Sequence, residues 1–356
     1  MVFRPLPLLP IVAAAIVLAI PSIATAQPGA PDQPDRLVTA AERAQVIESL
    51  GKVLKERYVF PDLAQRLDAR LREQLAAKAY DTVTSAKAFS RILSADLAAI
   101  ARDKHLNVFY FAQSMPTAPP PRPTGPDPFA ARNYGFMKAE RMAGNVGYLK
   151  LDAFADPQGD AGQIAVAAMG FLAGTDALII DLRENGGGSP GMVALLCSYF
   201  FEGRPVHLNS LYWRVPDQTQ QWWTLAYIPG KRYTNRDVYV LTSSRTFSAA
   251  EEFTYNLRTQ KRASIVGETT GGGAHPGGME RLGDHFGAFI PSGRAINPIT
   301  KTNWEGTGVS PDIAVAADKA LDTAYRDALS KLAAKTRGPM IDRETKAALE
   351  KLGQGG

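Results

Sequence analysis

The sequence predicts an α/β protein with a small helical domain ahead of its core. Three observations predict this class: apolar residues at helical spacing over residues 39–101, short apolar runs typical of buried strands after residue 145, and helical stretches between those runs. The chain has 356 residues, 45% of them hydrophobic and 21% charged, with a formal net charge of +5. This composition is typical of a globular protein, and the scattered basic residues indicate no nucleic-acid partner.

Residues 1–26 have the character of a secretory signal peptide. Arg4 precedes an apolar stretch, and small residues at 24–26 match what a signal peptidase reads. The apolar run is short for a membrane span and contains two prolines, although a membrane anchor is the alternative. We therefore expect cleavage before Gln27, no stable membrane anchor afterwards, and an exported protein that is periplasmic or secreted.

Residues 27–114 are expected to form the helical domain. Thr39 and Glu42 have the spacing of a capping box, and apolar residues follow them on one helical face. Two further amphipathic stripes continue to Ile100, and three such stripes can bury a small core against one another. A strand-like segment at 107–110 follows. Residues 115–144 are expected to be a linker, because seven prolines lie within 116–128.

Residues 145–316 are expected to form the core. Four segments read as buried strands: 145–151, 177–182, 238–241 and 263–266. Helical stretches near 190–201 and 248–260 follow the second and third, an alternation that predicts a largely buried sheet. Residues 285–296, with Ser292-Gly293 in the middle, resemble a hairpin. Residues 317–356 are expected to be a C-terminal helix, at 318–335, and a tail.

Two segments of this core could carry chemistry. Ser248 lies where a buried strand passes through a polar turn into a helix, so the next amide, Ala249 N–H, could donate to an oxyanion, although a helix N-cap is the alternative. Three glycines end the run 181–188, and their conformational freedom lets the N–H groups of Gly187 and Gly188 face a ligand. A plain turn is the alternative there. A phosphate cradle is disfavoured because the run lacks a P-loop ending.

These segments resemble a known family. Asp-Leu-Arg-x-Asn-x-Gly-Gly at 181–188 and Ser-Ala-Ala-Glu at 248–251 resemble the core of the C-terminal processing, or tail-specific, peptidases. Val-Gly-Glu-Thr-Thr-Gly-Gly at 266–272 and Glu-Gly-x-Gly-Val-x-Pro-Asp at 305–312 do so too. The N-terminal helices and Asp-x-His-Leu at 103–106 extend the resemblance to the branch of the tricorn core and the interphotoreceptor retinoid-binding protein repeats. The resemblance implies a spiral ββα core of the ClpP and crotonase type behind a small helical domain.

The resemblance also implies an activity and a site. It implies a serine peptidase that acts by acyl transfer on peptides or unfolded proteins, with no cofactor and no metal. The processing branch uses a serine–lysine dyad and a PDZ domain, but here residues 270–275 hold no lysine and only the proline-rich stretch occupies the place of the PDZ domain. The tricorn-like branch instead implies Ser248 as nucleophile, His105 as base and Glu305 as third member. The oxyanion donors would be the amides of Ala249 and of Gly187 or Gly188.

Several alternatives stay open. His275, in a glycine-rich loop with Gly272 and Gly273, could be the base or line a substrate loop. Glu251 is expected to be a first-turn helix acid. The same fold could instead serve as a non-catalytic module for an apolar ligand or a peptide, or as a small-molecule esterase. Cys197 is the single cysteine and is expected to be buried, so an internal disulfide is excluded. No feature of the sequence indicates an oligomeric state.

Overall fold

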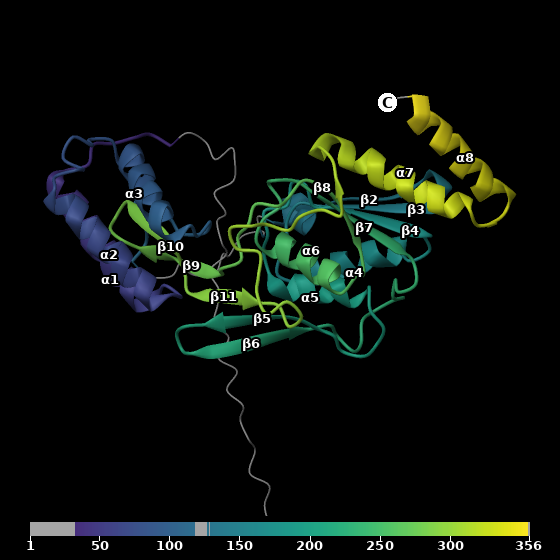
Figure 1. The fold of residues 1–356 in the computed structure, drawn as a ribbon, viewed down its shortest axis with the longest axis horizontal. Coiled ribbons are helices and arrows are strands. Elements are labelled where there is room, and N and C mark those ends of the chain that lie inside the picture. The colour runs from purple at the N-terminus through teal and green to yellow at the C-terminus, as the bar shows by residue number, and fades with distance from the viewer. Residues whose placement is uncertain (1–32, 118–126, 128, 355–356) are drawn as a thin grey trace, which may run out of the picture.

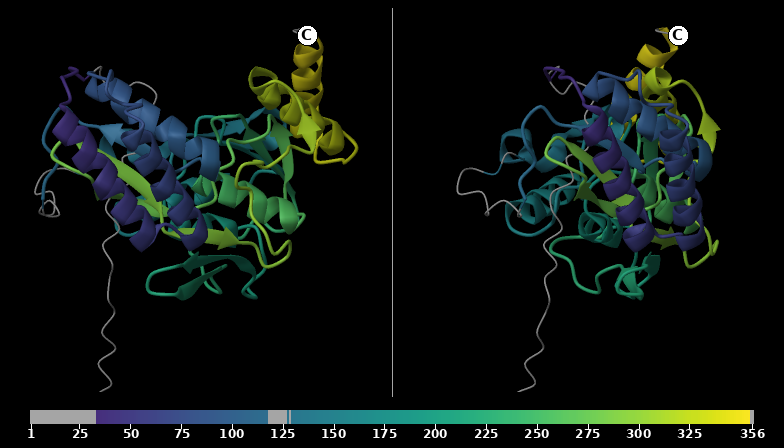
Figure 2. Two further views of the ribbon diagram at one scale, coloured as in Figure 1. Left: turned by 60° about the vertical axis from the view of Figure 1, so that its left-hand side comes forward. Right: turned by 90° about the vertical axis from the view of Figure 1, so that its left-hand side faces the viewer.

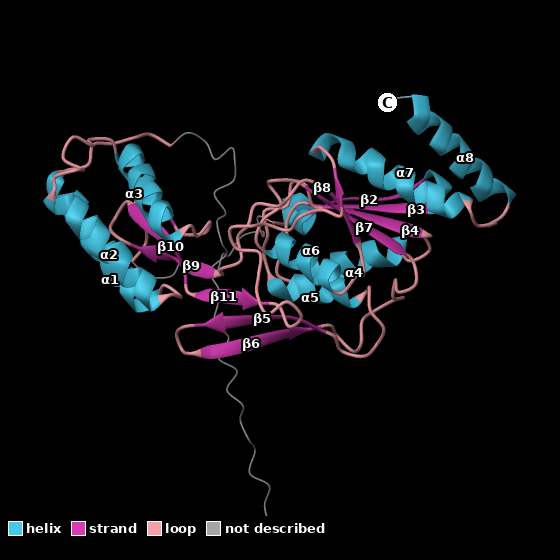
Figure 3. Ribbon diagram, viewed as in Figure 1, coloured by secondary structure: helices cyan, strands magenta, loops and turns pink. Residues whose placement is uncertain are grey.

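The computed structural model describes residues 33–117, 127 and 129–354. The expected signal peptide and most of the proline cluster lie outside these residues. A lobe of three helices with a small sheet stands beside a larger lobe in which helices cover both faces of a sheet (Figure 1, Figure 3). This is the mixed α/β architecture that the sequence predicts. Within the described residues, no helix combines the length and the apolar character needed to span a membrane.

The helical lobe forms from the three predicted stripes. Its helices are α1 (Ala40–Arg57), α2 (Pro61–Ala76) and α3 (Ala86–Ala101). Thr39 caps α1, because its hydroxyl accepts the Glu42 N–H at 3.2 Å. The apolar faces of the helices meet in one buried cluster. Burial of these faces, more than helix propensity, stabilises helices of this length.

The same cluster contains strands from much later in the chain. β1 (Asn107–Tyr110) pairs antiparallel with β10 (Phe286–Pro291), and β10 pairs with β9 (Gly277–Arg281). Phe286 is fully buried, and its ring centroid lies 5.7 Å from that of Phe89 on α3. The turned views show the purple and blue helices beside these yellow-green strands (Figure 2). The helical lobe therefore shares its core with the second half of the chain.

The larger lobe is built on a six-stranded sheet of order β12-β8-β7-β4-β3-β2. The neighbours pair in parallel, except that β2 at the edge is antiparallel to β3. The strands are β2 (Phe136–Met142), β3 (Val146–Leu151), β4 (Ala177–Asp181), β7 (Asp237–Thr242), β8 (Ser264–Gly267) and β12 (Ile313–Ala314). All four predicted buried strands are present here. β2, however, lies inside the stretch expected to be a linker.

Helices cover both faces of this sheet. α4 (Asp160–Leu172), α5 (Pro190–Ser198) and α6 (Ala249–Thr259) share a buried cluster with Leu178 and Ile180 of β4. α7 (Ala320–Ala333) packs with Ile179 on the other face, because successive strand residues point to opposite sides. α8 (Pro339–Gln354) packs beside α7 in place of the expected tail. The short 3-10 turns are η1 (Ala130–Gly135), η2 (Ala143–Asn145) and η3 (Ala317–Lys319).

A third sheet corrects one prediction. β5 (His207–Trp213) pairs with β6 (Gln218–Trp223) and with β11 (Gly293–Ile296), whereas β10 pairs only with β1 and β9. The hairpin expected over 285–296 is therefore wrong. The N–H groups of Ser292 and Gly293 both donate to the Pro276 carbonyl oxygen, at 3.0 and 2.9 Å. These bonds fix the link between β10 and β11, so that β11 joins the sheet of β5 and β6 and does not fold back onto β10.

The shared core makes a prediction about stability. Phe286→Ala should lower the free energy of unfolding by about 3–5 kcal/mol, because it leaves a cavity between the helices and β10. Urea denaturation followed by circular dichroism measures this change. The matched control is Phe171→Ala, since Phe171 is 61% exposed and its removal should change little. Equal effects of the two substitutions would contradict the shared core.

Candidate active site

Ser248 occupies a strained turn between β7 and α6. Its backbone has φ 55° and ψ −121°, a conformation that costs a non-glycine residue about 1–3 kcal/mol and persists only where surrounding bonds impose it. The Phe247 N–H donates to the Asn185 carbonyl oxygen at 3.0 Å, and the Ser248 N–H donates to Glu251 Oε2 at 2.9 Å. These bonds hold the serine at the carboxyl end of a central strand and at the start of a helix.

The glycine run packs directly against this turn. A Cβ on Gly187 would lie 2.7 Å from the Ser248 Cβ, so only a glycine permits the approach. The Gly187 N–H is already bonded, because it donates to Asn185 Oδ1 at 2.9 Å. Among the described residues, no acceptor takes the N–H of Gly188 or of Ala249. Of the two predicted glycine donors, the geometry therefore favours Gly188.

Glu251 is a buried hydrogen-bond centre, which the sequence reasoning missed. Its carboxylate accepts the N–H groups of Ser248, Gly272 and Gly273 and the hydroxyl of Thr270. Burial raises the pKa of Glu251 to about 7, although these four donors act in the opposite direction. The carboxylate thus ties the turn of Ser248 to the glycine-rich loop.

His105 lies against the same turn. Its ring centroid is 4.6 Å from that of Phe247, the residue before Ser248, and 5.6 Å from that of Phe289. Burial among these rings lowers the pKa of His105 to about 4, so the imidazole is neutral near neutral pH. Its Nδ1 is buried and has no hydrogen-bond partner among the described residues. The fold therefore brings residue 105 beside residue 247, although the chain separates them widely.

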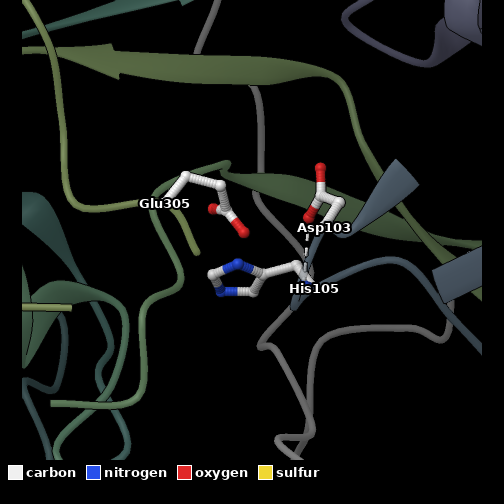
Figure 4. Close-up of side chains that lie close together, drawn as sticks. All are labelled: Asp103, His105 and Glu305. Atoms are coloured by element: carbon white, nitrogen blue, oxygen red, sulfur yellow. Dashed lines mark hydrogen bonds between the residues drawn. The ribbon is translucent and has the colours of Figure 1, made fainter. Parts of the chain in front are cut away.

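Glu305 reaches the segment that carries His105. Its Oε1 accepts the Lys104 N–H at 2.9 Å, and its Oε2 accepts the Ala274 N–H at 2.5 Å. One polar atom each of Asp103, His105 and Glu305 lie within 4.8 Å of one another. In the close-up, the His105 ring nitrogen next to the side-chain attachment faces the Glu305 carboxylate (Figure 4). Burial, and then the charge of Asp103, raises the pKa of Glu305.

His275 has a different environment from His105. Its Nδ1 lies 2.8 Å from Asp103 Oδ2 and 3.5 Å from Glu305 Oε2. Asp103 also accepts the Tyr58 hydroxyl at 3.1 Å and the His105 N–H at 3.1 Å. His275 is thus held between two carboxylates, while His105 contacts the residue that precedes Ser248. The only sequence signal for Asp103 was its place in the Asp-x-His-Leu motif.

The raised pKa of Glu251 predicts a pH dependence of stability. Below about pH 4.5, the usual pKa of a glutamate, the folded and unfolded states both hold the proton. Between 4.5 and 7 the unfolded state releases it and the folded state keeps it, so the free energy of unfolding falls by about 3 kcal/mol as the pH rises.

Glu251→Gln should remove this contribution. More than half of the slope should remain, because burial also raises the pKa of Glu252 to about 7 and raises the pKa of Glu305. Urea denaturation at a series of pH values measures the slope. Glu184→Gln is the matched control, since Glu184 is an exposed residue paired with Arg245. A slope unchanged in Glu251→Gln would show that this carboxyl ionises normally.

Comparisons with known proteins agree with this architecture. The model of peptidase family S41 matches residues 145–315, and that of the N-terminal domain of peptidase S41 in eukaryotic IRBP matches residues 37–134. A tail-specific protease of Haemophilus influenzae is 33% identical over 103 residues, a segment that makes up 27% of this chain and 13% of that protein. The chain therefore matches only a small part of that relative's length.

Solved structures are similar in fold. A candidate peptidase from Parabacteroides merdae has a TM-score of 0.58 at 20% identity, over 83% of this chain and 99% of that one. A lipoprotein from Streptococcus agalactiae has a TM-score of 0.53 at 15% identity, over 81% of this chain and 96% of that one. At such identities the similarity concerns the fold. The two S41 matches together span both lobes, and the protein belongs to peptidase family S41.

Proposed function

We propose that the protein is a serine peptidase that cleaves peptide bonds by acyl transfer at Ser248. The observation that carries the proposal is the strained backbone of Ser248 together with its surroundings. Gly187 packs against Ser248, and the His105 ring packs against the ring of the preceding residue, Phe247. Strained turns of this kind present a nucleophile at the end of a central strand. Membership in family S41 and the tail-specific protease relative support the same activity.

In the proposed mechanism, His105 takes the proton of the Ser248 hydroxyl as its oxygen attacks the substrate carbonyl. The Gly188 and Ala249 N–H groups donate to the oxyanion that forms. His105 then gives the proton to the leaving amine. Water attacks the acyl-enzyme in the second half of the cycle, with His105 again as base. The neutral state of the buried imidazole suits it to accept a proton near neutral pH.

Glu305 is proposed as the third member of the site. A carboxylate on the Nδ1 side of the ring favours the tautomer that carries its proton on Nδ1, which leaves Nε2 free to accept a proton from serine. The two hydrogen bonds from Lys104 and Ala274 hold the Glu305 carboxylate on that side. The carboxylate would also stabilise the imidazolium that forms during attack. We therefore propose that the Glu305 carboxylate acts directly on the His105 ring.

The substrate class follows from the family. Peptides and unfolded proteins are the proposed substrates, in accord with a family and a relative that are named as a peptidase family and a tail-specific protease. We also propose that the protein is exported, in accord with the expected leader at residues 1–26 and with the lipoprotein neighbour of similar fold. A periplasmic or secreted location would place it with extracytoplasmic substrates.

Ser248→Ala should abolish peptidase activity, because no other hydroxyl takes its place in the strained turn. Cleavage of a peptide library, followed by mass spectrometry, and labelling with a fluorophosphonate probe both measure the effect. Ser244→Ala is the matched control, since Ser244 lies exposed in the same turn and should leave both readouts unchanged. If the wild-type protein binds peptides but the fluorophosphonate probe does not label it, the protein is instead a non-catalytic module.

The two perturbed pKa values predict the pH profile of the peptidase. Protonation of Glu251 below about pH 7 leaves one of its four donors without an acceptor and loosens the turn of Ser248. We expect kcat/KM to be about tenfold lower at pH 6 than at pH 8, with no contribution from His105 until its pKa of about 4 is approached. In Glu251→Gln the residual activity should lose this step near pH 7. A wild-type profile that stays flat from pH 8 to pH 5 would refute the role of Glu251.

A further inference from the structure

Side chains from three distant segments converge beside the proposed nucleophile. Asp103 and Glu305 supply two carboxylates, and His105 and His275 supply two imidazoles. The Asp103 side chain is 1% exposed and that of Glu305 is 13% exposed. Among the described residues, His275 alone forms ion-pair contacts with these carboxylates, and neither contacts a lysine or an arginine side chain. The cluster therefore concentrates negative charge away from water without a permanent cation.

One atom in this cluster lacks a partner. His105 Nδ1 is buried and accepts or donates no hydrogen bond among the described residues. Buried polar atoms are almost always partnered, because leaving one unpaired costs about 1–3 kcal/mol. The close-up shows this ring nitrogen turned toward Glu305, with Asp103 near the end of the ring that joins the main chain (Figure 4). An unpartnered ring nitrogen and two carboxylates thus lie around one small space.

We propose that Asp103, His105 Nδ1 and Glu305 bind a divalent transition-metal ion of the zinc type, which inhibits the enzyme. The donor set fits this class, since Zn²⁺ accepts imidazole nitrogen together with carboxylate oxygen, whereas Ca²⁺ and Mg²⁺ prefer oxygen alone. Three protein ligands leave one position of a tetrahedral ion open. The inhibition, but not the binding of the ion, rests on the proposed peptidase function.

The geometry needs only a local adjustment. The three donor atoms lie within 4.8 Å of one another, whereas donors about 2.0–2.2 Å from a tetrahedral zinc ion stand roughly 3.4 Å apart. The Glu305 side chain can close this gap, because among the described residues only backbone N–H groups hydrogen-bond to its oxygens and His275 lies 3.5 Å away. Its contacts with Lys104 and Ala274 leave further lone pairs for a metal. The Asp103 carboxylate is already fixed by Tyr58.

The ion would act through the tautomer of His105. A metal on Nδ1 needs the lone pair of that nitrogen, so the single proton of the neutral ring moves from Nδ1 to Nε2. Nε2 then carries a hydrogen and cannot accept the proton of Ser248. The ion also occupies the carboxylate that would stabilise the imidazolium. Substrate contacts remain, so the metal should lower kcat and leave KM nearly unchanged.

The binding test uses the full chain with Ser248→Ala, which needs no catalysis. Titration with Zn²⁺ by isothermal calorimetry should show one ion per chain. Adding Glu305→Gln or Asp103→Asn should weaken binding about tenfold or more, because each removes a ligand. His207→Gln is the matched control, since that histidine stacks on Trp223 in the third sheet. If circular dichroism shows that Asp103→Asn does not fold, the test uses Glu305→Gln alone.

The inhibition test uses the wild-type enzyme. Zn²⁺ should lower kcat several-fold, a chelator should restore it, and His207→Gln should respond as the wild type does. Absence of zinc binding to the Ser248→Ala protein, or binding that survives Glu305→Gln but is lost in His207→Gln, would overturn the metal site. Zinc binding in a wild-type protein without peptidase activity would instead refute the proposed function and leave the metal site standing. An active enzyme that binds zinc at this cluster and keeps its full kcat would refute the inhibition.

Discussion

The carboxylate of Glu251 is the interaction on which the arrangement of the site depends. Without it, the N–H groups of Ser248, Gly272 and Gly273 would lose the acceptor that the strained turn and the glycine-rich loop share. In the same loop, the Ala274 N–H donates to the Glu305 carboxylate. Gly273 packs against the rings of His105 and Phe247. One buried acid thus links Ser248, the His105 imidazole and Glu305, which come from distant parts of the sequence. Burying a charged carboxylate costs free energy, and the raised pKa of Glu251 reflects this cost.

Much of the fold could be predicted from the sequence, because local patterns carry it. Apolar stripes in the first hundred residues and apolar runs in the core correspond to helices and strands that bury those residues. Strand partners were beyond such reasoning. Residues 286–291 and 293–296 look like the two arms of a hairpin, yet they join different sheets, because Pro276 accepts both N–H groups at the crossing. The exposed edge strand β6 has no apolar alternation and gave no signal.

The site was predictable only in part, for a physical reason. Ser248 and the glycines stand in turns with distinctive residue types, so their place at the end of strands can be inferred. Glu251 has the sequence position of any first-turn acid. Its bond from the Ser248 N–H is local, but only the tertiary fold buries it and adds the three donors of residues 270, 272 and 273. Asp103 likewise gains its hydrogen bonds with Tyr58, His105 and His275 only in the folded protein. Which amide is free for an oxyanion also depends on the bond between Gly187 and Asn185.

The strands β9 and β10 close the core around the first three helices, and this has a consequence for the order of assembly. A chain emerges from the ribosome from its N-terminus, so α1–α3 are made long before Phe286 can pack among them. His105 lies at the end of that early segment, whereas Ser248, the glycine-rich loop and Glu305 come late. Until the last strands are in place, the His105 imidazole does not have the turn of Ser248 beside it. Under the proposed assignment of Ser248 and His105, a nascent chain cannot cleave its own unfolded segments before these strands are added.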